Sequence, residues 1–119
     1  MIEIAMEQDF NNRTIALECS GHAGFDDGQG LDLVCSAVSA LTGALGLGLA
    51  EKSQPPLRVS VDDGHFAVDL RGQAASSEAH FLLDTIASSL LLLAQNYPGF
   101  CSIRRMQQVA DRSERRNPP

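Results

Sequence analysis

Residues 21–39 read GHAGFDDGQGLDLVCSAVS, and the rest of the chain is organised around this stretch. The pattern predicts the end of a strand, a glycine-rich loop and the start of an apolar-periodic helix. His22 follows the strand, and Cys35 lies in the first turn of the helix behind an expected N-cap at Asp32. Helix-start N–H groups and a nearby imidazole both favour a thiolate. The layout is typical of a cysteine nucleophile with its base, although a lone helical cysteine is more often a packed hydrophobe.

The same residues resemble the ribosomal-processing cysteine protease family. The match consists of the pair Gly21-His22 and of residues 30–39, GLDLVCSAVS, and it extends loosely to about Met106 through the pair Tyr97-Pro98. The resemblance implies a homodimeric enzyme that removes a short N-terminal extension from large-subunit ribosomal protein twenty-seven. It implies a catalytic dyad formed by the cysteine and the histidine described above. The loop sequence, the glycine-rich end of the first helix and the arginine-rich tail depart from the family pattern.

Three residues beside the dyad have expected supporting roles. Gly21 lets the backbone turn without a side-chain clash, so that His22 is free to approach the helix. Asp32 more naturally caps the helix than orients the histidine, so no third catalytic residue is identified. Ser39 follows Cys35 by one turn on the same face, where it hydrogen-bonds near the site or supports a subunit contact. The N–H groups of the first helical turn are the expected receivers of the oxyanion.

The loop between the two catalytic candidates contains Gly24, Phe25, Gly28 and Gly30. Neither a Gly-Lys-Ser/Thr motif nor a G-x-G-x-x-G pattern is present, so it is not a phosphate loop. We expect a flexible lid or substrate clamp in which Phe25 contacts an apolar side chain of the substrate. Plain loop flexibility is the alternative.

Hydrophobic periodicity predicts an α+β fold with the element order ββαββαβ. We expect a small, mixed or antiparallel five-stranded sheet with both helices on one face. Cys19 falls on the apolar face of the second strand and is expected in the core, as is Cys101 in the core or at an edge. The expected strands are 1–8, 14–19, 57–61, 66–71 and 100–106, and the expected helices are 32–52 and 76–96.

Length and charge predict one domain over residues 1–106 and a disordered, arginine-rich tail over residues 107–119. Residues 1–103 carry four basic and thirteen acidic side chains, whereas residues 104–119 carry five arginines and two acidic side chains, which gives a total charge of −6. An acidic body suits a basic protein partner, here a ribosomal protein precursor as substrate, and argues against direct nucleic-acid binding.

Residue usage argues against several other classes of protein. Three cysteines without C-x-x-C spacing argue against a disulfide framework or a zinc knuckle and indicate a reducing compartment. We expect neither a metal nor a cofactor, since His65 and His80 are isolated histidines. The longest apolar run falls short of the ~20 residues of a membrane span, and no secretory signal is visible. We therefore expect a cytoplasmic protein without a membrane partner.

Two other functions stay open at this point. One is a non-catalytic, ribosome-associated assembly factor in which Cys35 is merely packed. The other is a thiol hydrolase or redox protein that acts on a different substrate.

Overall fold

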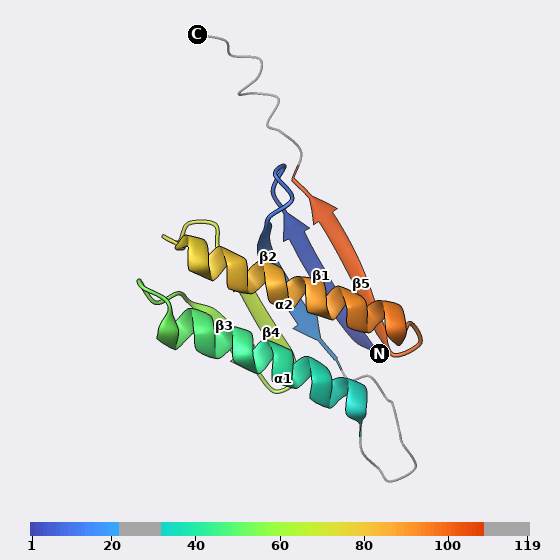
Figure 1. The fold of residues 1–119 in the computed structure, drawn as a ribbon. Coiled ribbons are helices and arrows are strands. Elements are labelled where there is room, and N and C mark those ends of the chain that lie inside the picture. Colours follow the sequence, from blue (N-terminus) through green and yellow to red (C-terminus); the bar gives the residue numbers. More distant parts are fainter. Residues whose placement is uncertain (22–31, 109–119) are drawn as a thin grey trace.

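Five strands and two long helices make up the computed structural model, which describes residues 1–21 and 32–108. Their order, ββαββαβ, confirms the α+β fold expected from the sequence. Figure 1 shows both helices on the same face of the sheet. The elements are β1 (Ile2–Gln8), β2 (Thr14–Ser20), α1 (Leu33–Leu47), β3 (Val59–Asp62), β4 (His65–Asp69), α2 (Ser77–Asn96) and β5 (Cys101–Gln107), and one π-helical turn, η1 (Gly48–Lys52), continues α1.

The sheet has the strand order β3-β4-β2-β1-β5. Short turns join β1 to β2 and β3 to β4, so these pairs are antiparallel, as is the pair β2–β4. Helix α2 carries the chain across the sheet before β5, which therefore pairs with β1 in parallel. In the described part of the chain, β3 and β5 are the edge strands.

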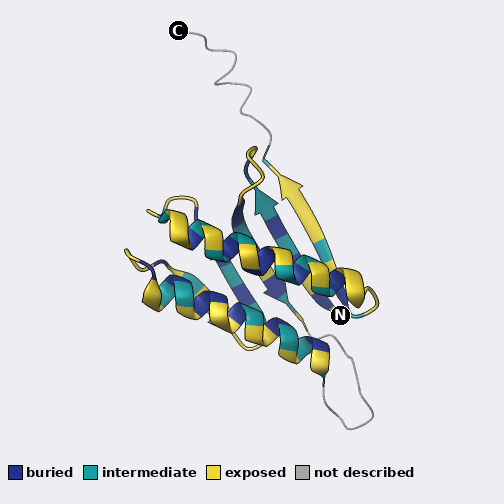
Figure 2. Ribbon diagram, viewed as in Figure 1, coloured by how far each residue is buried: buried dark blue, intermediate teal, exposed yellow. Residues whose placement is uncertain are grey.

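The core lies between the sheet and the two helices. Alternate residues of β1 (Ile2, Ile4 and Met6) are buried beneath the helices, as the period-two pattern predicts. Leu45 of α1 and Leu90 of α2 are fully buried against them. Figure 2 shows this division, with the inner faces of the helices dark blue and much of their outer faces yellow.

Close packing accounts for two of the three glycines near the end of α1. A Cβ atom at Gly46 would lie 3.4 Å from the ring of Phe66, and one at Gly48 would overlap the side chain of Leu82 on α2. A Cβ atom at Gly43 would meet nothing within 4 Å. Several glycines near the end of a helix are typical either of fraying or of close packing. The structure shows that this end of α1 packs against both β4 and α2.

The apolar run in α2 is buried on one side only. Leu90 is fully buried, but Leu92 is 60% exposed in the single chain. A run that is apolar nearly all round, as residues 90–93 are, predicts burial on two sides, against the sheet and against either the first helix or a partner subunit. Helix α1 does pack beside α2, but it does not cover Leu92.

Candidate active site

Gly21 fixes the point where the chain leaves β2. Its φ of +95° is one that L side chains rarely adopt, and a Cβ atom there would lie 2.7 Å from the backbone oxygen of Met1. Its N–H donates to the backbone oxygen of Gly64, in the turn between β3 and β4, at 3.0 Å. The residue that precedes His22 is thus held between β1 and the β3–β4 turn.

Cys35 lies in the first turn of α1, and Asp32 is the N-cap, as the sequence predicted. The Asp32 Oδ1 atom accepts the Cys35 N–H at 2.8 Å, and its backbone oxygen accepts the Ser36 N–H at 3.0 Å. These hydrogen bonds fix the backbone of the first helical turn, which carries Cys35. The cap also occupies the Cys35 N–H, so the oxyanion site expected from the first turn cannot use that group in this conformation.

The three cysteines differ in their surroundings, and none is in a disulfide. Cys19 and Cys101 are buried on the helix-covered face of the sheet. Burial, together with the nearby Cys101 and Glu18, raises the pKa of Cys19 to about 12, and burial raises the pKa of Cys101 as well. Cys35 is partly exposed. Only Cys35 therefore combines access to solvent with a place at a helix N-terminus.

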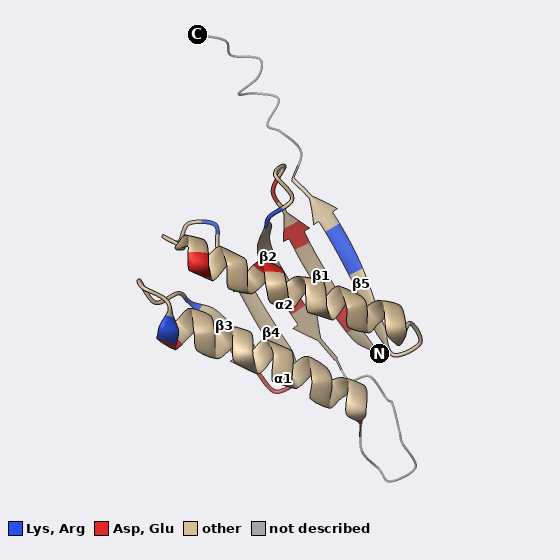
Figure 3. Cartoon of the chain, viewed as in Figure 1, with Lys and Arg blue, Asp and Glu red and all other residues tan. Residues whose placement is uncertain are grey.

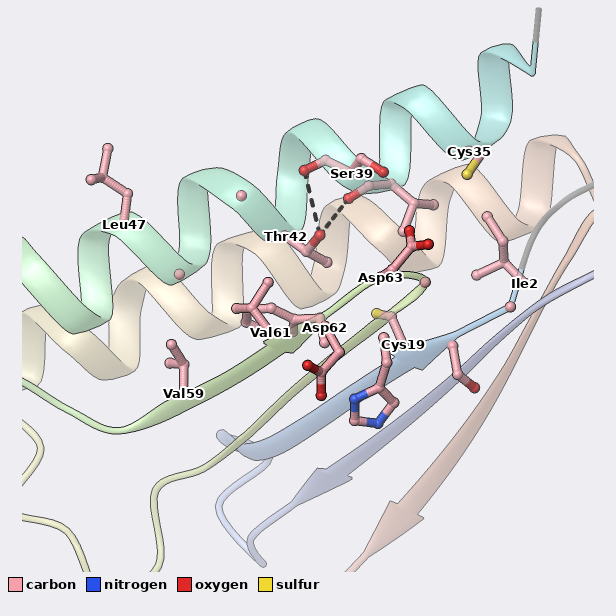
Figure 4. Close-up of a pocket in the computed structure, with 18 of the residues that line it drawn as sticks. Ile2, Cys19, Cys35, Ser39, Thr42, Leu47, Val59, Val61, Asp62 and Asp63 are labelled. Carbon is pink, nitrogen blue, oxygen red and sulfur yellow. Dashed lines mark hydrogen bonds between the residues drawn. The ribbon is translucent and has the colours of Figure 1, made fainter.

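Cys35 opens onto a groove of about 490 Å³ between α1 and the β3–β4 hairpin. Figure 4 shows Cys35, Ser39 and Leu47 along one wall and Val59 and Val61 along the other. The floor is formed by apolar core side chains and the end of β2. The lining residues are Ile2, Cys19, Ser20, Gly21, Cys35, Val38, Ser39, Thr42, Gly43, Gly46, Leu47, Ala50, Glu51, Val59, Val61, Asp62, Asp63, Gly64, His65 and Phe66.

The charged residues on the groove lining are acidic. Glu51 and Asp63 contribute carboxylates, and no lysine or arginine of the described residues lines it. Asp62 also borders the groove, but it pairs with His65, so alternation directs its side chain to the helix-free face. A groove with apolar walls and acidic ends suits an extended peptide with both apolar and basic side chains.

Comparison with known proteins identifies the family of the chain. A family model described as cysteine protease Prp matches residues 1–102. The chain belongs to the cysteine protease Prp family. It is a cysteine protease, and the resemblance noted in the sequence is confirmed.

Solved structures share the fold. The protein SMU.848 from Streptococcus mutans is 26% identical, with a TM-score of 0.71, and the match covers 91% of this chain and 96% of that one. The ribosomal processing protease Prp from S. aureus, bound to a covalently linked product peptide, is 24% identical with a TM-score of 0.69, and 91% and 100% of the two chains are covered. The structure of the same enzyme with a substrate peptide is 19% identical in the aligned sequence, with a TM-score of 0.69, and the match covers 88% of this chain and 99% of that one. No curated protein matches the chain.

Several predicted site residues of this Prp family member fall outside the described residues. They include the expected base, His22, and the substrate-loop residues Gly24, Phe25, Gly28 and Gly30. Ser39 lines the groove one helical turn from Cys35, and its backbone oxygen accepts a hydrogen bond from Thr42 Oγ1 at 3.4 Å.

The histidine that the structure does place by the groove, His65, is engaged elsewhere. Its Nε2 atom lies 3.3 Å from Glu18 Oε2. His65 pairs with Asp62 and Ser20 across the sheet, and the next residue, Phe66, is the one buried under the helices. Alternation therefore places the His65 side chain on the helix-free face. In the part of the chain that the structure describes, no three His, Cys, Asp or Glu residues are grouped to hold a metal ion.

The wall formed by β3 and its turn was not recognised from the sequence. The Asp63-Gly64 pair between two alternating segments is typical of a hairpin, and the structure has a hairpin there. Nothing in the local pattern indicates which element the hairpin faces, because that depends on the strand order of the whole sheet.

The burial of the cysteines predicts selective alkylation. At pH 8, iodoacetamide should modify Cys35 at least about tenfold faster than Cys19 or Cys101 in the folded protein, because the buried thiols are neutral and inaccessible. Peptide mass mapping after timed quenching measures the three rates. In urea the three rates should converge. Equal modification of all three cysteines in the native protein would contradict the assignment of Cys35 as the accessible thiol.

Proposed function

We propose that this protein is the cysteine endopeptidase that removes the N-terminal extension from the precursor of large-subunit ribosomal protein twenty-seven. The observation that carries the proposal is the partly exposed Cys35 at the N-terminus of α1, which opens onto a peptide-sized groove. The S. aureus relative, named as a ribosomal processing protease, supports it because one structure of that enzyme holds a covalently linked product peptide.

The chemistry uses a dyad of Cys35 and His22. His22 takes the thiol proton, or keeps the thiolate paired, and the sulfur attacks the scissile carbonyl. The C–N bond breaks as His22 returns the proton to the leaving amine, which leaves the N-terminal fragment on Cys35 as a thioester. Water, deprotonated by His22, then hydrolyses this thioester and restores the thiol. Asp32 contributes by holding the Cys35 backbone rather than as a third member, because its carboxylate accepts the Cys35 N–H.

Charge supports a basic substrate. The chain carries a net charge of −6, and the carboxylates of the groove add a local negative potential. A ribosomal protein precursor is a substrate of complementary charge, and a cytoplasmic enzyme would meet it before or during ribosome assembly. No direct contact with nucleic acid is part of this proposal.

The role of His22 is tested against the other histidine near the groove. His22→Ala should lower kcat/KM at least about 10²-fold, because it removes the general base and acid. His65→Ala should change kcat/KM by less than about threefold, because its ring faces Glu18 on the helix-free side. The measurement is steady-state cleavage of a fluorogenic peptide that spans the junction. If the two variants exchange these effects, His65 is the base.

The substrate is tested with the whole precursor. Incubation with the wild-type protein should shorten the precursor at its N-terminus, which intact-protein mass spectrometry detects as the loss of one defined fragment. The mature ribosomal protein, incubated in parallel, should keep its mass. A precursor that stays intact at enzyme concentrations that cleave other peptides would overturn the substrate assignment and favour a protease or thiol hydrolase with another substrate.

We also propose that the protein is a homodimer, and that the outer surface of the helical layer is its interface. The segments Leu33–Lys52 and Ser77–Asn96 are apolar and long enough to cross a membrane by length and composition, but each contributes one side to the core beneath the helices. Figure 3 shows that charge is sparse on these helices. Asp84, within α2, accepts the Thr14 N–H at the start of β2. Phe81 and Leu92, which are 74% and 60% exposed, lie on one side of α2. An uncharged layer of this kind suits a second copy.

The dimer is tested by placing charge on that layer. Phe81→Glu combined with Leu92→Glu should convert the dimer to monomer in sedimentation-velocity runs, because an unpaired carboxylate buried in an apolar interface costs several kcal/mol. Phe10→Glu is the matched control, since Phe10 is 60% exposed in the turn between β1 and β2. A wild-type protein that sediments as a monomer at micromolar concentration would contradict the proposal.

A further inference from the structure

The outer edge of β3 forms one wall of the groove into which Cys35 opens. β3 is the last strand on its side of the sheet, and its single partner among the described strands is β4. Edge strands expose unpaired N–H and C=O groups and are templates for a further strand. Here that edge lies beside the candidate nucleophile rather than on a remote surface.

The register identifies which backbone groups face outward. The Gly21 N–H donates to the Gly64 oxygen, and the Leu70 N–H donates to the Ile15 oxygen. The even-numbered residues of β4 therefore direct their backbone groups toward β2, and the odd-numbered ones direct theirs toward β3. The β3 partners of the odd-numbered residues are Ser60 and Asp62. Val59 and Val61 must then direct their N–H and C=O groups away from the sheet.

The side chains of these two valines face the same groove. They pair with Val68 and Phe66, whose side chains are buried beneath the helices. Val61 is nevertheless 65% exposed, because α1 does not cover this edge. Figure 4 shows Val59 and Val61 on the hairpin across from α1. A peptide on this edge would have one row of side chains between the hairpin and the helix.

The length of the groove suits an extended peptide. It follows α1 from Cys35 to Ala50, a rise of roughly 22 Å at 1.5 Å per residue. An extended chain rises ~3.3 Å per residue, so this length holds about six residues. Asp63 lies toward the Cys35 end of the groove (Figure 4), and Glu51 follows Ala50 at the other end. These carboxylates favour basic side chains there.

We infer that the substrate binds as an additional β-strand on the edge of β3. Its backbone pairs with the outward N–H and C=O groups of Val59 and Val61, every second side chain enters the apolar groove, and a basic side chain lies against Asp63. This inference rests on the proposed function only in assigning the bound peptide as the substrate. The edge of β3 is then a recognition element separate from the catalytic dyad. Main-chain pairing aligns any extended peptide, and the groove selects peptides by their side chains.

The backbone pairing is tested by removing one donor. Val61→Pro deletes an outward N–H that takes no part in the ladder with β4, and edge strands tolerate proline at such positions. We expect kcat/KM for the junction peptide to fall about tenfold, mostly through KM, with the thermal unfolding midpoint nearly unchanged. Arg105→Pro is the matched control, because it removes an outward N–H from the opposite edge strand, β5, away from the groove, and it should stay within about twofold of wild type. An unchanged kcat/KM in Val61→Pro would overturn the inference.

A second measurement uses the peptide backbone and is independent of cleavage. N-methylation of single amides of the junction peptide should weaken binding to the Cys35→Ala protein about tenfold at every second position and less than about twofold between them. In ¹⁵N NMR spectra, the Val59 and Val61 amides should shift on peptide addition. Uniform effects along the peptide, or shifts confined to other residues, would overturn strand addition. Failure of the wild type to cleave a peptide that binds with this pattern would instead overturn the proposed function.

The role of the Asp63 carboxylate in binding a basic side chain is tested separately. Asp63→Asn should raise KM for a lysine-containing peptide about three- to fivefold at low salt, and the difference should shrink as salt is added. For the same peptide with norleucine in place of lysine, the wild type and the variant should have equal KM values. Equal KM values for the lysine peptide would contradict the role of Asp63 in recognition.

Discussion

Cys35→Ala is expected to lower kcat/KM for the junction peptide by at least about 10⁴-fold, because it removes the sulfur that forms the acyl intermediate. The fold should survive, since the helix start is held by Asp32 through backbone groups that alanine also has. Steady-state cleavage and far-UV circular dichroism measure the two properties.

Cys101→Ala is the matched control for the loss of a thiol. Cys101 is 1% exposed and packs in the core at the start of β5, so its replacement should leave kcat/KM nearly unchanged and lower stability modestly. Substantial cleavage by Cys35→Ala would show that the reaction does not pass through this sulfur. The assembly-factor interpretation would then apply if the wild type also bound the precursor without cutting it.

Gly21→Ala is expected to have the second largest effect. The new Cβ atom would lie 2.7 Å from the backbone oxygen of Met1, at a φ that disfavours side chains, so β1 and the end of β2 must move apart. We expect a loss of about 2–4 kcal/mol in the free energy of unfolding. Because the next residue is His22, kcat/KM should fall about 10²-fold through misplacement of the base.

Gly72→Ala separates the backbone strain from the steric clash. Gly72 has a φ of +77°, but a Cβ atom there would meet nothing within 4 Å. It should cost only about 1–2 kcal/mol of stability and leave cleavage intact. Urea unfolding of both variants gives the comparison. If the two alanine variants lose equal stability and both retain activity, Gly21 is not the residue that positions the base.

Much of the fold followed from local patterns in the sequence. Alternation in β1 and β2 placed Ile4 and Cys19 on one face, and the structure pairs them there. Asp32 was expected as a helix cap and is one. Cap chemistry and strand alternation depend on neighbours within a few residues, which is why a single sequence contains them.

The site was less predictable, because its parts meet only after the sheet is assembled. That β3 is an edge strand, and that it lines the same groove as Cys35, depends on the order β3-β4-β2-β1-β5. The Cys35 N–H donates to Asp32 Oδ1, so this group is not available to the expected oxyanion site. A residue pattern does not show which N–H group of the first turn the capping side chain accepts. The packing of Gly48 against Leu82 depends on how the two helices approach each other.

The most direct test of the account is to locate the acyl group during cleavage of the ribosomal precursor. The wild-type protein is mixed with the precursor, quenched in acid within milliseconds to seconds, digested at low pH and analysed by mass spectrometry. The account predicts that the peptide containing Cys35 gains the mass of the N-terminal extension, less one water, and that this adduct is absent from Cys35→Ala. Cleavage at an undiminished rate by Cys35→Ala, or an adduct on another residue, would contradict it.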